Sequence, residues 1–119
     1  MNPISFDLPD IGLREISGTL SLDDEFLVFH VQDAFIGEFD KEHMVIKVEP
    51  QALQAIRFDR GIIRDRICIQ PKKRDLLTVM PGTYAEELQL KIWNTYRADA
   101  KPLVEEVQRR MKAVAPRAV

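Results

Sequence analysis

Seven basic side chains cluster in one segment of this chain of 119 residues, and they could bind an anion. Residues 50–75 hold 7 basic and 3 acidic side chains, a net charge of +4. Cations on one face of a hairpin attract an anion or an acidic partner, whereas scattered charges on a sheet edge only discourage aggregation. We favour the solvated edge, because Asp59, Asp65 and Asp75 are interleaved and dilute the positive field. The candidate binding residues are Arg57, Arg60, Arg64, Arg66, Lys72, Lys73 and Arg74.

The net charge differs sharply between segments of the chain. Residues 1–49 hold 3 basic and 11 acidic side chains, net −8, and residues 76–119 are net +2, so that the whole chain is net −2. This overall charge does not attract nucleic acid, and we expect no nucleic-acid partner. If the acidic part of one copy met the basic hairpin of another, head-to-tail contacts would build a ring or a filament.

No other group of residues has the spacing of a catalytic or metal site. Glu38, Asp40, Glu42 and His43 place oxygen and nitrogen ligands close together, but without the glycine-bearing spacing of a calcium loop, which favours a solvated turn. His30 lies within an apolar run, which predicts a buried histidine. No serine or cysteine has a nucleophile motif, and no glycine belongs to a phosphate-binding loop. We therefore expect no catalytic residue, cofactor or metal ion.

The chain has one cysteine and one tryptophan. Cys68 cannot form an internal disulfide, which indicates a reducing compartment, and we expect it to be small and partly buried. Trp93 falls on the polar side of its predicted strand, and we favour cover by the following connection over an exposed anchor for a partner. No apolar run approaches the roughly 18 residues of a membrane span, and the N-terminus lacks a signal-peptide layout. We expect a cytoplasmic protein with one domain over residues 1–119, its core at about 14–114.

Alternating apolar and polar residues predict seven strands. Asp23 and Asp24 predict the turn of one hairpin, and Asp59, Arg60 and Gly61 that of another, with Gly61 free to take positive φ. The predicted strands are 15–22, 25–31, 35–39, 43–49, 55–59, 63–70 and 87–93.

From Asp99 the apolar period changes to 3.6, which predicts one amphipathic helix. Asp99 is the expected N-cap, Pro102 fits the first turn, and each of Glu105 and Glu106 has an arginine four residues later. The apolar stripe comprises Ala100, Leu103, Val104, Val107, Met111 and Val114. Strands followed by one terminal helix predict a mainly β fold, a bent antiparallel sheet or partly open barrel with the helix at one end.

This order of elements resembles the bacterial members of the pleckstrin-homology-like superfamily over roughly residues 16–111. The residues that carry the resemblance are Gly18-Thr19-Leu20, Val48-Glu49-Pro50 with Leu53 and Ile56, Arg60-Gly61, Pro81-Gly82, Leu88-Gln89-Leu90-Lys91-Ile92 and the helical residues 100–107. The resemblance implies seven strands in two near-orthogonal sheets with a C-terminal helix, and a binding or assembly role without chemistry. Members that bind phosphoinositides have a basic loop between the first two strands. Here Asp23-Asp24-Glu25 takes that place and would repel a phosphorylated headgroup.

We therefore expect a non-enzymatic module that acts through protein contacts, with a protein partner or with itself as a homo-oligomer. The alternative is peripheral binding to an anionic membrane or another polyanion through the basic hairpin from Arg57 to Arg74.

Overall fold

The computed structural model describes residues 2–8, 14–35, 42–72 and 87–113. Over these residues the chain forms seven strands and one α-helix, so the expected mainly β fold is confirmed. Two short 3₁₀ helices, η1 and η3, lie before β5 and before the α-helix. The elements are β1 (Ile4–Asp7), β2 (Arg14–Leu22), β3 (Leu27–Phe35), β4 (Glu42–Val48), η1 (Pro50–Ala52), β5 (Leu53–Asp59), β6 (Arg64–Pro71), β7 (Leu88–Trp93), η3 (Asn94–Tyr96) and α1 (Arg97–Ala113).

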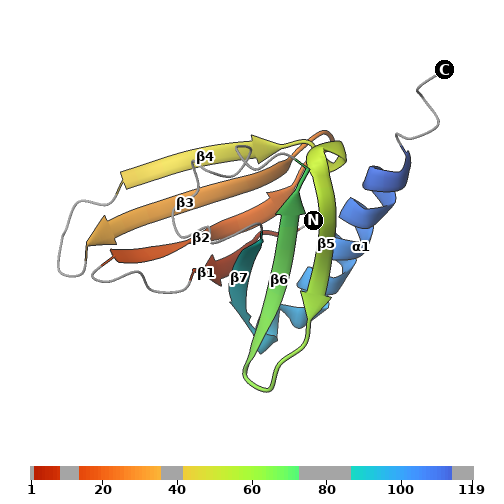
Figure 1. Ribbon diagram of the computed structural model, residues 1–119. Coiled ribbons are helices and arrows are strands. Elements are labelled where there is room, and N and C mark those ends of the chain that lie inside the picture. The colour runs from red at the N-terminus through yellow and green to blue at the C-terminus, as the bar shows by residue number, and fades with distance from the viewer. Residues whose placement is uncertain (1, 9–13, 36–41, 73–86, 114–119) are drawn as a thin grey trace.

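All seven strands belong to one antiparallel sheet in the order β4-β3-β2-β1-β7-β6-β5. Strands β2 to β4 run across the view of Figure 1, and β5 to β7 run down it. The sheet therefore bends where β1 meets β7, and there the register aligns only Asp7 with Lys91. The sheet is open, with β4 and β5 at its edges, and α1 packs against β5 and η1.

The predicted apolar faces meet in one core. Alternate residues of β2, β6 and β7 point inward and share one core with the apolar stripe of α1, of which Val114 lies outside the described residues. Burying each large aliphatic side chain of this kind contributes about 1.5 to 3 kcal/mol. The buried residues from these elements are Ile16, Leu20, Leu22, Ile67, Ile69, Leu88, Leu90, Ile92, Ala100, Leu103, Val104 and Val107.

Strand β1 was not predicted, and it adds Ile4 and Phe6 to the core, upstream of the expected start at residue 14. Its residues Ile4-Ser5-Phe6-Asp7 do alternate, but four residues is the shortest run in which a period of two can be recognised. The predicted strand 35–39 is not seen as such, because Phe35 ends β3 and residues 36–39 lie outside the described chain. His30 is exposed, because it occupies the outward side of β3 at a point that no element covers; its predicted burial was wrong.

Because β1 comes first, the acidic turn Asp23-Asp24-Glu25 joins the second strand to the third. The expected match between this turn and the loop joining the first two strands was therefore wrong. The Asp23 carboxylate accepts hydrogen bonds from the N–H groups of Glu25 and Phe26, which lower the pKa of Asp23 and close the turn.

Helix α1 begins two residues before its predicted start, because η3 already turns the chain into helical geometry at Arg97. Asp99 therefore lies inside the helix instead of at the N-cap, and Pro102 lies in the second turn. Glu106 binds Arg110 at 3.1 Å, as predicted. Arg109 also binds Glu106 and not Glu105, and the two guanidinium groups lower the pKa of Glu106 to about 2.

Gly18 allows β2 and β3 to approach closely. A Cβ atom at this position would lie 1.9 Å from the carbonyl oxygen of His30 and 3.1 Å from the ring of Phe6. The backbone oxygen cannot move aside without shifting β3, so any side chain here forces the strands apart.

We expect Gly18→Ala to lower the free energy of unfolding by roughly 1 to 3 kcal/mol, the usual cost of overpacking. Urea denaturation followed by circular dichroism measures it. Ser5→Ala, at an exposed position of β1 that adds no new atom, is the control and should change stability by less than about 0.5 kcal/mol. Equal stability of the Gly18 variant and the wild type would contradict the close approach.

Candidate functional site

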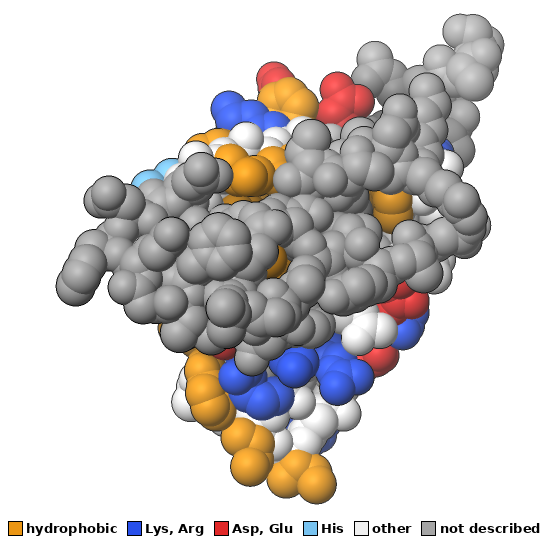
Figure 2. Space-filling view, turned by 60° about the vertical axis from the view of Figure 1, so that its left-hand side comes forward, with side chains coloured by type: hydrophobic (Ala, Val, Ile, Leu, Met, Phe, Trp, Pro, Cys, Tyr) orange, Lys and Arg blue, Asp and Glu red, His pale blue; other side chains and the backbone are white. Residues whose placement is uncertain are grey.

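The most exposed bulky apolar side chains of the described residues gather at the turn between β5 and β6. We call residues 60–63 of this turn the hairpin tip. Ile62 is 93% exposed and Ile63 is 61% exposed, and Trp93, at the end of the neighbouring strand β7, is 48% exposed. In Figure 2 apolar side chains form the lower end of the molecule, below a group of Lys and Arg side chains. Contiguous exposed apolar groups of this kind mark interaction sites.

Trp93 belongs to this surface because Arg64 connects it to the hairpin. The two residues are register partners on β6 and β7, and the Arg64 guanidinium lies 4.2 Å from the centre of the indole ring. The prediction that a connection covers Trp93 was wrong, and half of the ring faces solvent.

A buried ion pair holds the backbone of the tip in place. Asp65 is 0% exposed, and Arg97 at the start of α1 donates from Nε and Nη2 to its two carboxylate oxygens, each at 3.0 Å. The Gly61 N–H donates to Asp65 Oδ1 at 2.9 Å, and Arg97 also donates to the Gly61 carbonyl oxygen at 3.3 Å. These hydrogen bonds satisfy the carboxylate and hold the pKa of Asp65 below its usual value, with Arg97 as the largest cause.

Asn94 in η3 fixes the two isoleucines directly. Its N–H donates to the Ile63 carbonyl oxygen at 3.1 Å, and its side-chain amide donates to the Ile62 carbonyl oxygen at 3.4 Å. The isoleucine side chains therefore face solvent from a backbone that two other elements hold. Their exposure is a built feature of the fold and not the result of a frayed turn.

Gly61 is required at the tip because of a close approach. A Cβ atom on it would lie 2.0 Å from the carbonyl oxygen of Arg64. The predicted hairpin is present, and the φ of Gly61 lies outside the left-handed region, so the turn does not use the freedom of glycine to take positive φ. The turn needs glycine because it is tight.

The structure separates the seven predicted basic residues into groups. Arg60 lies in the tip, and Arg64 and Arg66 project from the outer face at the start of β6. Arg57 is engaged by Asp59 at 3.2 Å and by Glu87 at 2.9 Å. Lys72 follows the far end of β6, about 26 Å along the strand from the tip by strand geometry. Lys73 and Arg74 lie outside the described residues.

Arg64 also binds acidic and backbone groups on its own face. It donates to Asp7 at 2.7 Å and to the Lys91 carbonyl oxygen at 3.2 Å. Arg66 and Lys91 are register partners, and within the described ranges neither side chain has an ion-pair partner. Like charges directly opposite each other destabilise a sheet, so this pair is better suited to an external anion.

Four residues at or beside the tip were missed from the sequence: Ile62, Ile63, Lys91 and Arg97. Asp65 was expected to dilute the positive charge, but it points into the core and Arg97 neutralises it. The sequence did contain a signal for this burial, because Asp65 lies on the same side of β6 as Ile67 and Ile69. Asp59 is occupied by Arg57. The tip is thus more basic than its linear sequence indicates.

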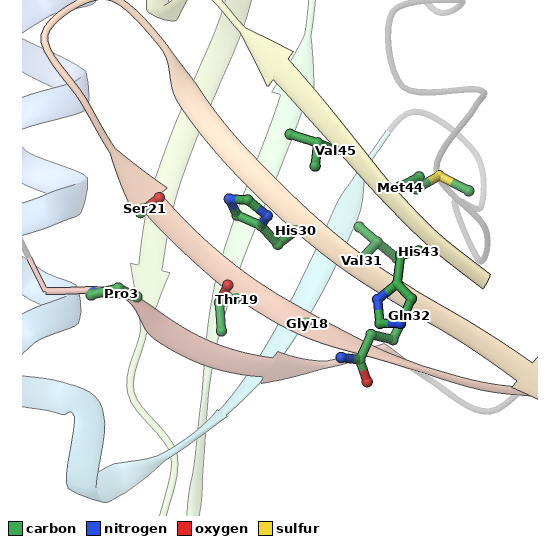
Figure 3. A pocket seen from close by; sticks show the side chains of 10 residues that line it. All are labelled: Pro3, Gly18, Thr19, Ser21, His30, Val31, Gln32, His43, Met44 and Val45. Atoms are coloured by element: carbon green, nitrogen blue, oxygen red, sulfur yellow. The ribbon is translucent and has the colours of Figure 1, made fainter. Parts of the chain in front are cut away.

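A second feature is an open groove of about 450 Å³ on the outer face of β2, β3 and β4 (Figure 3). His30 lies opposite Val45, and His43 lies opposite Gln32, so both imidazoles share this face. In the described parts of the chain no three metal-ligating side chains come together. Glu38 and Asp40 lie outside those parts, as does the Glu42 side chain.

Cys68 is buried on β6, and burial raises the pKa of its thiol to about 12. The thiol stays protonated at neutral pH and is therefore a poor nucleophile.

No helix in the described ranges is both long enough and apolar enough to cross a bilayer. Comparisons with protein-family models, with curated proteins and with solved structures give no match to this chain.

We expect Asp65→Asn to lower the free energy of unfolding at pH 7 by roughly 3 kcal/mol, because it leaves Arg97 without its carboxylate partner. The folded-state pKa of Asp65 is depressed, so its contribution is complete above the unfolded value of 3.8 and is lost as the pH falls below it. The stability difference between wild type and variant should therefore narrow from pH 7 to pH 3. Urea titrations at both pH values measure it, and a difference that does not depend on pH would contradict the role of the carboxylate.

Proposed function

We propose that this chain is a non-enzymatic, cytoplasmic binding module of pleckstrin-homology-like fold that docks on an anionic surface through the hairpin tip. The cations for this contact are Arg60, Arg66 and Lys91, which we call the basic collar; Arg64 lies beside them but is engaged by Asp7. The observation that carries the proposal is the burial of Asp65 against Arg97, because it removes from the outer face the carboxylate that lies between Arg64 and Arg66 in the sequence. The isoleucines of the tip give the same surface an apolar contact.

The fold proposal is supported by the order of elements and by the bend of the sheet. Two runs of antiparallel strands cross at β1 and β7, and one amphipathic helix follows them, as in a partly open barrel. A phosphate site between the first two strands is not supported. Residues 8–13, Leu-Pro-Asp-Ile-Gly-Leu, hold no basic side chain. We therefore assign the contact with an anion to the β5–β6 hairpin.

We expect Arg60→Gln with Arg66→Gln to weaken binding to vesicles that contain phosphatidylglycerol about thirtyfold in 50 mM salt, at about 1 kcal/mol for each lost cation. Co-sedimentation measures the loss. The control is Lys47→Gln with Lys112→Gln, which removes the same charge from exposed positions near the ends of β4 and α1, far from the tip (Figure 1).

Raising the salt to 200 mM should weaken binding of the wild-type chain, because it shortens the range of the attraction. Equal losses from both pairs of substitutions would mean that only net charge matters. Absence of wild-type binding to these vesicles and to heparin would contradict the proposal.

The second candidate is self-assembly or binding of another protein, supported by the separation of charge within the sheet. The acidic residues 1–49 supply β1 to β4, and the net-positive residues 50–75 supply β5 and β6. Two copies could then join head to tail.

Sedimentation velocity over a range of concentrations tests this candidate. We expect association at 50 mM salt that weakens at 500 mM, since screening reduces contacts between opposite charges. A monomer at every salt and protein concentration would contradict it.

A further inference from the structure

We propose that the hairpin tip inserts into the interface of an anionic phospholipid bilayer, with Ile62 and Ile63 as the inserting side chains. This inference rests on the proposed function and deepens it, because it selects a bilayer over a soluble polyanion. It concerns a surface at the β5–β6 turn and needs no pocket for a particular headgroup.

The first argument is the order of chemical groups along the hairpin. Ile62 and Ile63 occupy the turn itself, and Arg60 and Arg64 flank them on the two chain segments that lead back to the sheet. Side chains that are 93% and 61% exposed at such a turn meet a partner first. A soluble polyanion offers charge but no apolar layer for them, whereas a bilayer offers hydrocarbon beneath its anionic headgroups.

Trp93 and Arg64 come next behind the turn residues, toward the body of the sheet. Trp93 is half exposed, with the Arg64 guanidinium over its ring, at the end of β7 beside the turn. An indole with one apolar face and a polar edge is suited to the headgroup level of a membrane. Lys91 and Arg66, two register pairs deeper on the same strands, remain at the charged surface.

The shape of the tip favours a bilayer over a protein partner. In Figure 1 the turn projects at the end of the β5–β6 hairpin. A stable protein interface buries about 800 Å² on each side, with an apolar centre inside a polar rim. Three apolar side chains at the end of a narrow hairpin do not supply such a surface, whereas insertion into lipid needs no complementary pocket.

The rigid backbone of the tip adds to the affinity expected from it. Asp65, Arg97 and Asn94 already hold the turn in the free protein. Insertion therefore does not have to order the loop, and less conformational entropy is lost on binding.

The test compares two variants of the chain. One carries Ile62→Ser and Ile63→Ser together, and the other carries Val45→Ser. Val45 is 54% exposed but lies alone on β4, away from the tip, which makes it the matched control. The probes are vesicles of phosphatidylglycerol and phosphatidylcholine at about 3:7, in which charge and an apolar layer occur together, and heparin, which supplies charge alone. Trp93 is the single tryptophan of the chain, so its fluorescence reports from the tip.

We expect the double variant to bind the vesicles at least about tenfold more weakly than wild type, with heparin binding unchanged. The Val45 variant should behave as wild type with both probes. Trp93 emission should shift to shorter wavelength with vesicles and not with heparin, because only a bilayer removes the ring from water. Urea denaturation should show all three chains equally stable, since the substituted side chains are exposed.

Three results would overturn the inference. If the double variant bound vesicles as wild type does while loss of Arg60 and Arg66 abolished binding, insertion would be wrong and the anionic-surface function would stand. If the double variant lost self-association in sedimentation velocity but kept vesicle binding, the tip would be a protein contact. If wild type bound neither vesicles nor heparin, the proposed function would fail together with the inference.

Discussion

The buried pair of Asp65 and Arg97 is the interaction on which the arrangement of this molecule's exposed surface depends. It joins β6 to the first residue of α1 across 32 positions of sequence. Because the same carboxylate accepts from Gly61 and the same guanidinium donates to Gly61, the pair also closes the β5–β6 turn. One ionic contact thus ties the start of the helix to the turn and withdraws a carboxylate from the outer face.

A buried ion pair of this kind is poorly explained as a source of stability alone. Removing the Asp65 charge from water, with Arg97 left 26% exposed, costs several kcal/mol, and apolar replacements of similar volume are often as stable. An apolar pair could not accept a hydrogen bond from the Gly61 N–H or donate one to the Gly61 carbonyl oxygen. With such a pair, these two backbone groups of the turn would lose their partners. The pair is therefore better understood as the support that lets Ile62 and Ile63 face water without disordering the hairpin.

Local patterns predicted most of the elements, because strand and helix periods are written in neighbouring residues. The alternation of Leu88, Leu90 and Ile92 defined β7, and the stripe from Ala100 to Val107 defined the packed face of α1. The patterns failed where a local signal was short or was overridden by its surroundings. Strand β1 is four residues long, and α1 begins at Arg97 because a 3₁₀ turn precedes it.

The sequence by itself determined which residues carry charge, which alternate with apolar neighbours and which segment is basic. Only the tertiary structure decided which of those charges are available. Arg57 is engaged by Asp59 and Glu87, Asp65 is withdrawn by a distant arginine, and Lys91 joins Arg66 from another strand. Apart from Asp59, which lies two residues from Arg57 on the same strand, these partners meet only when the sheet pairs and the helix docks. The electrostatic field at the hairpin tip depends on distances between residues that are far apart in the sequence. A pattern of neighbouring residues does not contain those distances.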